Sequence, residues 1–260
     1  MMNKLKMTAM ILIAVMATGM MAGCGSDASA AEAESSSVTT KTAAETSGES
    51  EETGSSLTTG GWTIFSDETK ANIPEGAQAA LDKALSAYTG TGFTPVAYLG
   101  SQVVAGTNYK FLCRAQAVTP DAQESFVTVT VYEDLQGNAE ITEVKDFHLT
   151  DYLENKEIAS SEEGMTGGWA VSENDGTMME MTVEIQRAFD TATENLTGCT
   201  YEPVAVLGSQ VVAGSNYAIL CRVTPVTPNA TPHFAVVQVN APISGTASIM
   251  TICDLDISLL

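Results

Sequence analysis

The chain has 260 residues, of which 44% are hydrophobic, so it has enough apolar material for one large domain or two small ones. Its 32 acidic and 11 basic residues give a formal net charge of −21. Such an acidic chain repels nucleic acid and anionic lipid head groups, which excludes nucleic-acid binding. Solubility outside the cell is the simplest interpretation of the charge.

The N-terminus is similar to the signal peptide of a bacterial lipoprotein. Lys4 and Lys6 precede an uncharged, largely apolar run over residues 7–22, which is shorter than the roughly 20 residues of a membrane span. The run ends in Met-Ala-Gly-Cys at 21–24, which resembles a lipobox. The resemblance implies that residues 1–23 are removed and that Cys24 is lipidated, anchoring an exported protein to the cell envelope, facing outward. The alternative is an ordinary secreted protein with a chance cysteine.

An internal repeat organises the rest of the chain. Residues 95–120 and 203–228 are identical at 19 of 26 positions, at a constant offset of 108. Before the repeat, a stretch rich in Ser, Thr, Ala and Glu has too few apolar residues to fold, which predicts a disordered tether. We therefore expect a tether at 24–58, a first domain at 59–150, an acidic linker at 151–165 and a second domain at 166–260.

Within each repeat the hydrophobic pattern predicts one helix followed by antiparallel strands. Apolar residues recur at helical spacing over 74–90 in the first repeat and 178–198 in the second. The later segments alternate, placing Tyr109, Phe111 and Cys113 on an inner face and Lys110 and Arg114 on the other. The expected fold class is α+β, with each domain one helix wrapped by the apolar face of a four- to five-stranded antiparallel sheet.

The motifs that lie between the predicted elements of both repeats resemble those of the cystatin family. The motifs of the first repeat are most similar to those of its stefin branch. A glycine pair precedes the helix, a Gln-x-Val-x-Gly loop joins two strands, and Leu-Gln-Gly at 135–137 is similar to the stefin Leu-Pro-Gly turn. The resemblance covers both repeats and none of the first 58 residues. It implies two tandem cystatin-like domains.

The resemblance also implies inhibition of papain-like cysteine proteases of a host or of neighbouring microbes, because three segments of a cystatin form a wedge that fills the active-site cleft. The alternative for the Gln-Val-Val-Ala-Gly loop is a tight turn whose valines cap the core. The implied contact residues of the first domain are Gly60, Gly61, Gln102, Val103, Val104, Ala105, Gly106, Leu135, Gln136 and Gly137. Those of the second domain are Gly167, Gly168, Gln210, Val211, Val212, Ala213, Gly214, Pro242, Ile243 and Ser244.

Two features depart from the cystatin pattern. Neither repeat has the Pro-Trp dipeptide of secreted cystatins, and the second has no leucine at the stefin turn. Trp62 and Trp169 follow the glycine pairs, where stefins carry a smaller apolar residue. The sequence leaves open whether these rings pack on the sheet or crowd the wedge.

The sequence predicts no catalytic residue, metal site or cofactor, and therefore a protein that is not an enzyme. The two histidines occupy non-equivalent positions, and no Cys or His spacing suggests zinc. Cys113 and Cys221 recur on an apolar strand face, which favours buried small hydrophobes. Cys199 and Cys253 could pair, but free thiols are favoured. The competing functional hypothesis is a non-inhibitory binding or structural module of the envelope.

Overall fold

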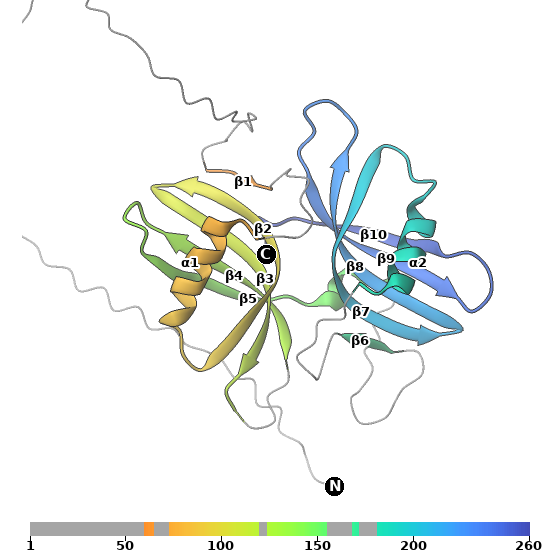
Figure 1. The fold of residues 1–260 in the computed structure, drawn as a ribbon, viewed down its shortest axis with the longest axis horizontal. Coiled ribbons are helices and arrows are strands. Elements are labelled where there is room, and N and C mark those ends of the chain that lie inside the picture. The colour runs from red at the N-terminus through yellow and green to blue at the C-terminus, as the bar shows by residue number, and fades with distance from the viewer. Residues whose placement is uncertain (1–59, 65–72, 120–123, 155–167, 172–180) are drawn as a thin grey trace, which may run out of the picture. The chain divides into compact units, whose positions relative to one another are not determined.

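The computed structural model describes residues 60–64, 73–119, 124–154, 168–171 and 181–260, all of which belong to one compact unit, Gly54–Leu260. Each repeat forms a five-stranded antiparallel sheet, and the strand order follows the chain in both (Figure 1). The first sheet consists of β1 (Trp62–Thr63), β2 (Thr91–Val104), β3 (Gly106–Ala117), β4 (Ser125–Glu133) and β5 (Ala139–Asp146). The second consists of β6 (Trp169–Val171), β7 (Cys199–Val212), β8 (Gly214–Pro225), β9 (His233–Pro242) and β10 (Ser248–Leu255).

Two α-helices lie where the sequence places helices. α1 (Glu75–Ser86) begins directly after Pro74, which suits a helix start because proline lacks an N–H to donate. α2 (Val183–Thr193) begins after Thr182, whose side chain accepts a hydrogen bond from Ile185 N. The buried face of each helix packs on one face of its own sheet, which gives each repeat its own small core. The Met178 end of the predicted second helix lies outside the described residues.

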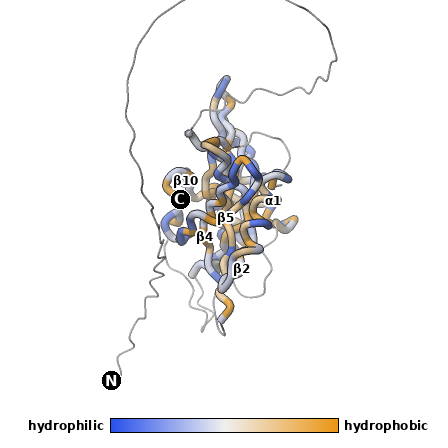
Figure 2. Tube along the Cα trace, turned by 90° about the vertical axis from the view of Figure 1, so that its left-hand side faces the viewer, coloured by the Kyte–Doolittle hydropathy of each residue, from blue (hydrophilic) through white to orange (hydrophobic). Residues whose placement is uncertain are grey.

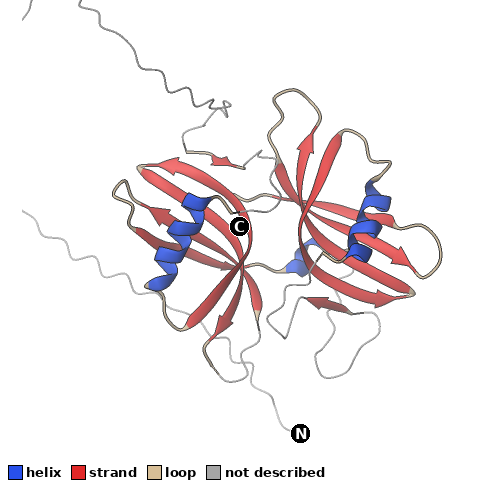
Figure 3. Ribbon diagram, in the orientation of Figure 1, coloured by secondary structure: helices blue, strands red, loops and turns tan. Residues whose placement is uncertain are grey.

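The prediction of an α+β fold of cystatin type, with each sheet wrapped around one helix, is wrong. The described residues are mostly antiparallel strand, arranged in two curled five-stranded sheets with only two short α-helices and one 3₁₀ helix, η1 (Leu149–Tyr152) (Figure 3). The helices cover part of one sheet face, where they contact the last two strands of the sheet most extensively. The opposite face of each sheet is not a polar outer surface, because it belongs to a second and larger core.

The strands are apolar on both faces, which is the physical reason for this difference. Six consecutive residues of β4 are buried, and the same is true of β9. On β3, Lys110 and Arg114 lie on the face opposite Phe111 and Cys113, as the alternation predicts, yet both are buried. A sheet buried on both faces needs a second layer. One face receives the helix, and the other faces the larger core.

Irregular pairing brings further apolar residues to that second face. The β2–β3 register shifts twice, skipping Val96 and Leu99, and the β7–β8 register shifts at the equivalent Val204 and Leu207. A bulge reverses the face on which a side chain lies relative to strict alternation. All four skipped residues pack in the larger core.

The larger core joins the two repeats. Leu99, Leu112 and Phe126 of the first repeat share one cluster with Leu207, Leu220 and Phe234, which occupy equivalent positions in the second. Trp169, fully buried, belongs to the same cluster. In Figure 2 orange, hydrophobic segments recur along the strands that supply this core. The two repeats therefore share a single hydrophobic interior on the faces away from their helices.

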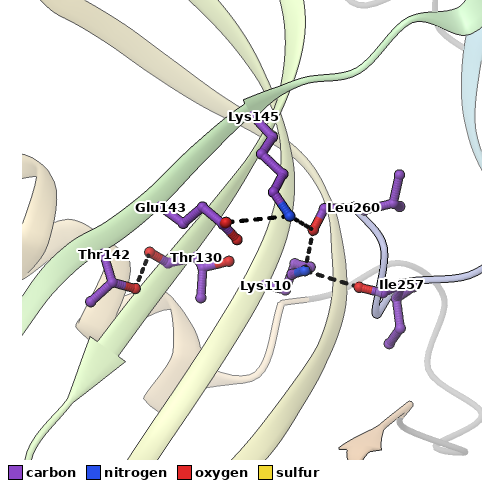
Figure 4. Close-up of polar contacts among 7 residues, drawn as sticks. All are labelled: Lys110, Thr130, Thr142, Glu143, Lys145, Ile257 and Leu260. Carbon is purple, nitrogen blue, oxygen red and sulfur yellow. Dashed lines mark hydrogen bonds and ion pairs between the residues drawn. The ribbon is translucent and has the colours of Figure 1, made fainter. Parts of the chain in front are cut away.

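The segment after the last strand of each repeat packs against the other repeat. After β10, Ile257 is buried in the shared core, and its carbonyl accepts a 2.9 Å hydrogen bond from Lys110 Nζ. Lys110 also donates to the backbone oxygen of Leu260, and Lys145 Nζ lies 3.4 Å from the same oxygen (Figure 4). Burial away from water lowers the pKa of Lys110. The end of the second repeat is thus fixed to the first sheet.

The reciprocal contact follows β5. Leu149 and Leu153 are buried in the shared core, and a Leu149 methyl lies 3.1 Å from where a Cβ on Gly208 of the second repeat would be. Gln238 Nε2 donates a 2.9 Å hydrogen bond to the carbonyl of Tyr152, while its Oε1 accepts from Glu154 N at 3.4 Å. The predicted linker at 151–165 therefore begins with residues that pack into the interior.

We expect Leu207→Ala to lower the free energy of unfolding of the whole unit by about 2–5 kcal/mol, because Leu207 is fully buried in the shared core. Unfolding by urea, followed by tryptophan fluorescence and by circular dichroism, should give one coincident transition that shifts as a whole. Leu259→Ala is the matched control, since Leu259 is 76% exposed, and its effect should stay within about 0.5 kcal/mol. Two separate transitions, with only one shifted, would contradict the shared core.

Candidate functional site: the two hairpin tips

The β2–β3 hairpin ends in an exposed apolar tip in the first repeat. Val104 pairs with Gly106 across the reversal, so the strands remain paired up to the turn. Val103 is 37% exposed and Val104 is 43% exposed, and Ala105 is exposed as well. Three adjacent apolar side chains therefore lie at the surface on a strand pair that is hydrogen-bonded to its end.

Gly106 has a conformation and a position that exclude other residues. Its φ is +131°, and a Cβ there would lie 2.3 Å from the carbonyl oxygen of Glu133 and 2.9 Å from the ring of Tyr132. Tyr132 Oη donates a 2.6 Å hydrogen bond to the carbonyl of Ala105. The start of β3 thus packs closely against the end of β4, which leaves the backbone of the tip little room to move.

Gln102 ties the glycine segment to the hairpin. Its Nε2 donates to the carbonyl of Gly60 at 2.8 Å, and its Oε1 accepts from Asn108 Nδ2 at 2.8 Å. Gly60 N donates in turn to the carbonyl of Val103 at 3.3 Å. Both ends of the Gln102 amide are therefore used inside the protein. We interpret this residue as one that positions the Gly60–Gly61 segment, not one that contacts a partner.

The β4–β5 turn lies at the same end of the sheet as the tip. Glu133 pairs with Thr107, one residue from Gly106, and with Ala139 across the turn. Leu135, at the apex, is 79% exposed, and Gln136 beside it is exposed too. The structure thus brings together the three segments of the first repeat that the sequence predicted to act together: the glycine pair, the hairpin and this turn.

The second repeat has the same arrangement. Val212 pairs with Gly214, whose φ is +123° and where a Cβ would lie 2.2 Å from the carbonyl oxygen of Ala241. Val211 is 63% exposed and Ile243, in the β9–β10 turn, is 84% exposed. Other predicted residues also lie at this end: Ala213 and Ser244 are exposed, Val212, Pro242 and Gly168 are half-buried, and Gln210 is buried.

A different set of hydrogen bonds holds the second tip. Ile243 N donates to the carbonyl of Ala213 at 3.3 Å, in place of the tyrosine contact of the first tip. Asn240 donates to Asn216 at 2.7 Å, and Asn216 donates to Gln210 at 2.6 Å, which makes a row of side-chain amides across three strands. Gly167 and Cys24, both predicted as functional residues, lie outside the described residues.

The tryptophans that follow the glycine pairs pack inward and do not crowd the tips. Trp62 pairs with Gln102 and Trp169 with Gln210, so the two rings have equivalent places in their sheets. Trp62 packs against the shared core with Lys110 Nζ 4.7 Å above its ring, and Trp169 is fully buried. The roles of Lys110 and Gln238 in joining the repeats were not predicted from the sequence. Their only signal there is that the repeats differ at these positions, which Ala218 and Thr130 occupy in the other copy.

The titratable side chains do not assemble a catalytic group within the described residues. Cys113 and Cys221 are buried. Burial raises the pKa of Cys113 to about 12 and raises the pKa of Cys221 as well, which disfavours the reactive thiolate in both. All four described cysteines are free thiols. His233 Nε2 lies 3.2 Å from an Asp254 oxygen, an ordinary surface pair. Over the same described residues, no group of three metal-ligating side chains is close enough to hold an ion.

We expect Gly106→Ala to destabilise the first hairpin, because the new methyl group overlaps the Glu133 carbonyl and the backbone has a positive φ. Strained backbone of this kind costs about 1–3 kcal/mol. Gly92→Ala, in the neighbouring strand β2, is the control: its φ is not in the positive range and its Cβ would lie 3.8 Å from the nearest atom, so the substitution should be neutral or stabilising by up to about 1 kcal/mol. Equal urea midpoints for the two variants would contradict the close approach.

Comparison with known proteins adds no relative on which to base a function. No family model matches the chain, and no curated protein matches it either. The functional interpretation therefore depends on the residues at the two tips.

Proposed function

We propose that the chain is a non-catalytic binding protein that docks on other proteins through its two hairpin tips. Its proposed partners are papain-like cysteine proteases, and each tip would block the active-site cleft of one. The observation that carries the proposal is the convergence, in each repeat, of a paired hairpin and a neighbouring turn that both present exposed apolar residues. Exposed apolar groups that recur at equivalent places mark contact sites.

The rigidity of the tips supports docking. Strand pairing extends to the reversal, and Gly106 and Gly214 lie against the next strand, so a tip loses little conformational freedom when it binds. A rigid, narrow, apolar projection suits a cleft better than a flat surface. The resemblance of the Gln-Val-Val-Ala-Gly sequence to that of protease inhibitors supports the choice of partner.

We also propose that the protein is exported and held at the bacterial cell envelope by a lipid on Cys24. The support is the order of basic residues, apolar run and Met-Ala-Gly-Cys at the N-terminus. Among the described residues, no helix has the length and hydrophobicity that crossing a membrane requires. A partner protease would then be one that reaches the cell from outside, from a host or from neighbouring microbes.

A second candidate is a non-inhibitory binding or structural module of the envelope. The observation that favours it is the fold: because the helix-wrapped arrangement expected for a cystatin is not present, the case for a protease partner depends on the hairpin sequence alone. In that case, the same tips would dock on a different protein, or the sheets would serve as a scaffold.

Inhibition of papain by the full chain tests the choice, with hydrolysis of a small fluorogenic peptide as the readout. The double variant Val103→Asp and Val211→Asp should weaken inhibition at least about 100-fold, or about 2.7 kcal/mol, because each new carboxylate would have to be desolvated in the contact. The fold should be unchanged by circular dichroism, since both valines are exposed.

The chain offers matched controls for this test. Val144 is 39% exposed on β5 and Val226 is 68% exposed beyond β8, close to the values of 37% for Val103 and 63% for Val211. Val144→Asp and Val226→Asp should leave inhibition unchanged. Inhibition that persists in the tip variant would refute docking through the tips. A folded wild-type chain that does not inhibit at micromolar concentration would favour the second candidate.

A further inference from the structure

The two tips share their apolar residues but differ in charge. The β4–β5 turn of the first repeat, residues 132–140, contains three carboxylates and no basic residue. The equivalent residues of the second repeat, 240–248, contain no charged residue at all. Glu133, Asp134 and Glu140 stand where the second repeat has Ala241, Pro242 and Ser248.

Two of these carboxylates have fixed positions beside the tip. Glu133 Oε2 accepts a hydrogen bond from Tyr109 Oη at 3.0 Å. Asp134 Oδ1 accepts from the backbone N–H groups of Gln136 and Asn138 at 2.9 and 2.8 Å, and its Oδ2 accepts from Asn138 Nδ2 at 2.9 Å. A partner therefore meets charges that need no further ordering when it docks.

One basic side chain partly offsets the carboxylates. Lys83, on α1, donates to the carbonyl of Gly137 in the same turn. Three carboxylates against one ammonium group leave two net negative charges at the first turn. Thr191 stands at the position of Lys83 in the second repeat, so the second turn has no equivalent of the Lys83 ammonium group.

We propose that the first tip docks in a protein cleft with a positively charged rim, and that the second tip docks in a cleft whose rim is uncharged. The inference rests on the proposed docking function and specifies its partner. Apolar residues at the centre of each tip fill a cleft in the same way, while charges at the rim decide which partner associates quickly. One chain thus carries two docking elements of different specificity.

The distinction should appear in the salt dependence of association. Charges at an interface rim act mainly on the association rate, and salt screens them beyond a Debye length of about 10 Å at 0.1 M. The overall charge of the chain acts on both tips, so the difference between the tips is the quantity that reports on Glu133, Asp134 and Glu140.

The experiment measures each tip in the full chain, with the other tip inactivated by Val211→Asp or Val103→Asp. The probes are two papain-like cysteine proteases, one of high and one of low isoelectric point, and the readout is the association rate at 20 mM and 500 mM NaCl. With the basic protease, the change to high salt should slow association of the first tip several-fold more than association of the second.

A charge-neutral first tip serves as the matched variant. Glu133→Gln, Asp134→Asn and Glu140→Gln preserve size and keep one acceptor oxygen at each position, while Asp134→Asn gives up the bond that Oδ2 accepts from Asn138 Nδ2. The triple variant should bring the salt dependence of the first tip to that of the second. Equal salt dependence of the two wild-type tips, or no change in the neutral variant, would overturn the inference and leave docking intact. Absence of inhibition by the wild-type chain would overturn the proposed function together with the inference.

Discussion

Packing of the two sheets through their second apolar faces is the constraint on which the rest of the structure depends. A single repeat has apolar residues on both faces of its middle strands but only one short helix to cover them. A large apolar face left in water would favour association or aggregation. The two repeats bury these faces in one cluster, and the segments after β5 and β10 add Leu149 and Ile257 to it. The two repeats therefore form one folded unit through their shared core.

The segments after β5 and β10 each pack on the other repeat. Their apolar contacts are nearly symmetric, but their hydrogen bonds are not. Leu149 and Ile257 stand at equivalent positions, and each lies beside an equivalent glycine of the other sheet, Gly208 or Gly100. The carbonyl groups of the segments, however, need donors, because a buried unpaired carbonyl is costly. Lys110 supplies them on one side and Gln238 on the other. Lys110 loses hydration in doing so, which lowers its pKa, while its ammonium group lies beside the accepting oxygen atoms and 4.7 Å from the centre of the Trp62 ring.

The local elements could be predicted from the sequence, but the layer arrangement could not. The apolar residues at helical spacing within 74–90 and 178–198 include Ala77, Leu81 and Ile185, which are buried, and alternation correctly placed Phe111 and Cys113 on the inner face of β3. Alternation did not predict the burial of Lys110, because a charged residue on the opposite face suggests solvent whether or not another layer covers it. The burial of Leu99 and Leu207 in the shared core could not be predicted, because a bulge changes the side on which a residue lies and leaves no mark in the hydrophobic pattern. The resemblance to cystatins then predicted a sheet wrapped around one helix with its other face in solvent. That arrangement does not fit sheets whose second face is buried in the shared core.

The hairpin sequence divides into residues that build the tip and residues that the tip presents. The side-chain amide of Gln102 hydrogen-bonds Gly60 through its nitrogen and Asn108 through its oxygen. Only glycine fits at position 106, because a Cβ there would clash with the end of β4. These two residues would be needed in this position even if the hairpin bound nothing, so their presence is not by itself a sign of protease inhibition. Val103, Val104 and Ala105 have no such role, because their side chains face solvent. Their exposure is the part of the motif that folding does not explain, and a functional test has to act on the valines and leave the glutamine and the glycine in place.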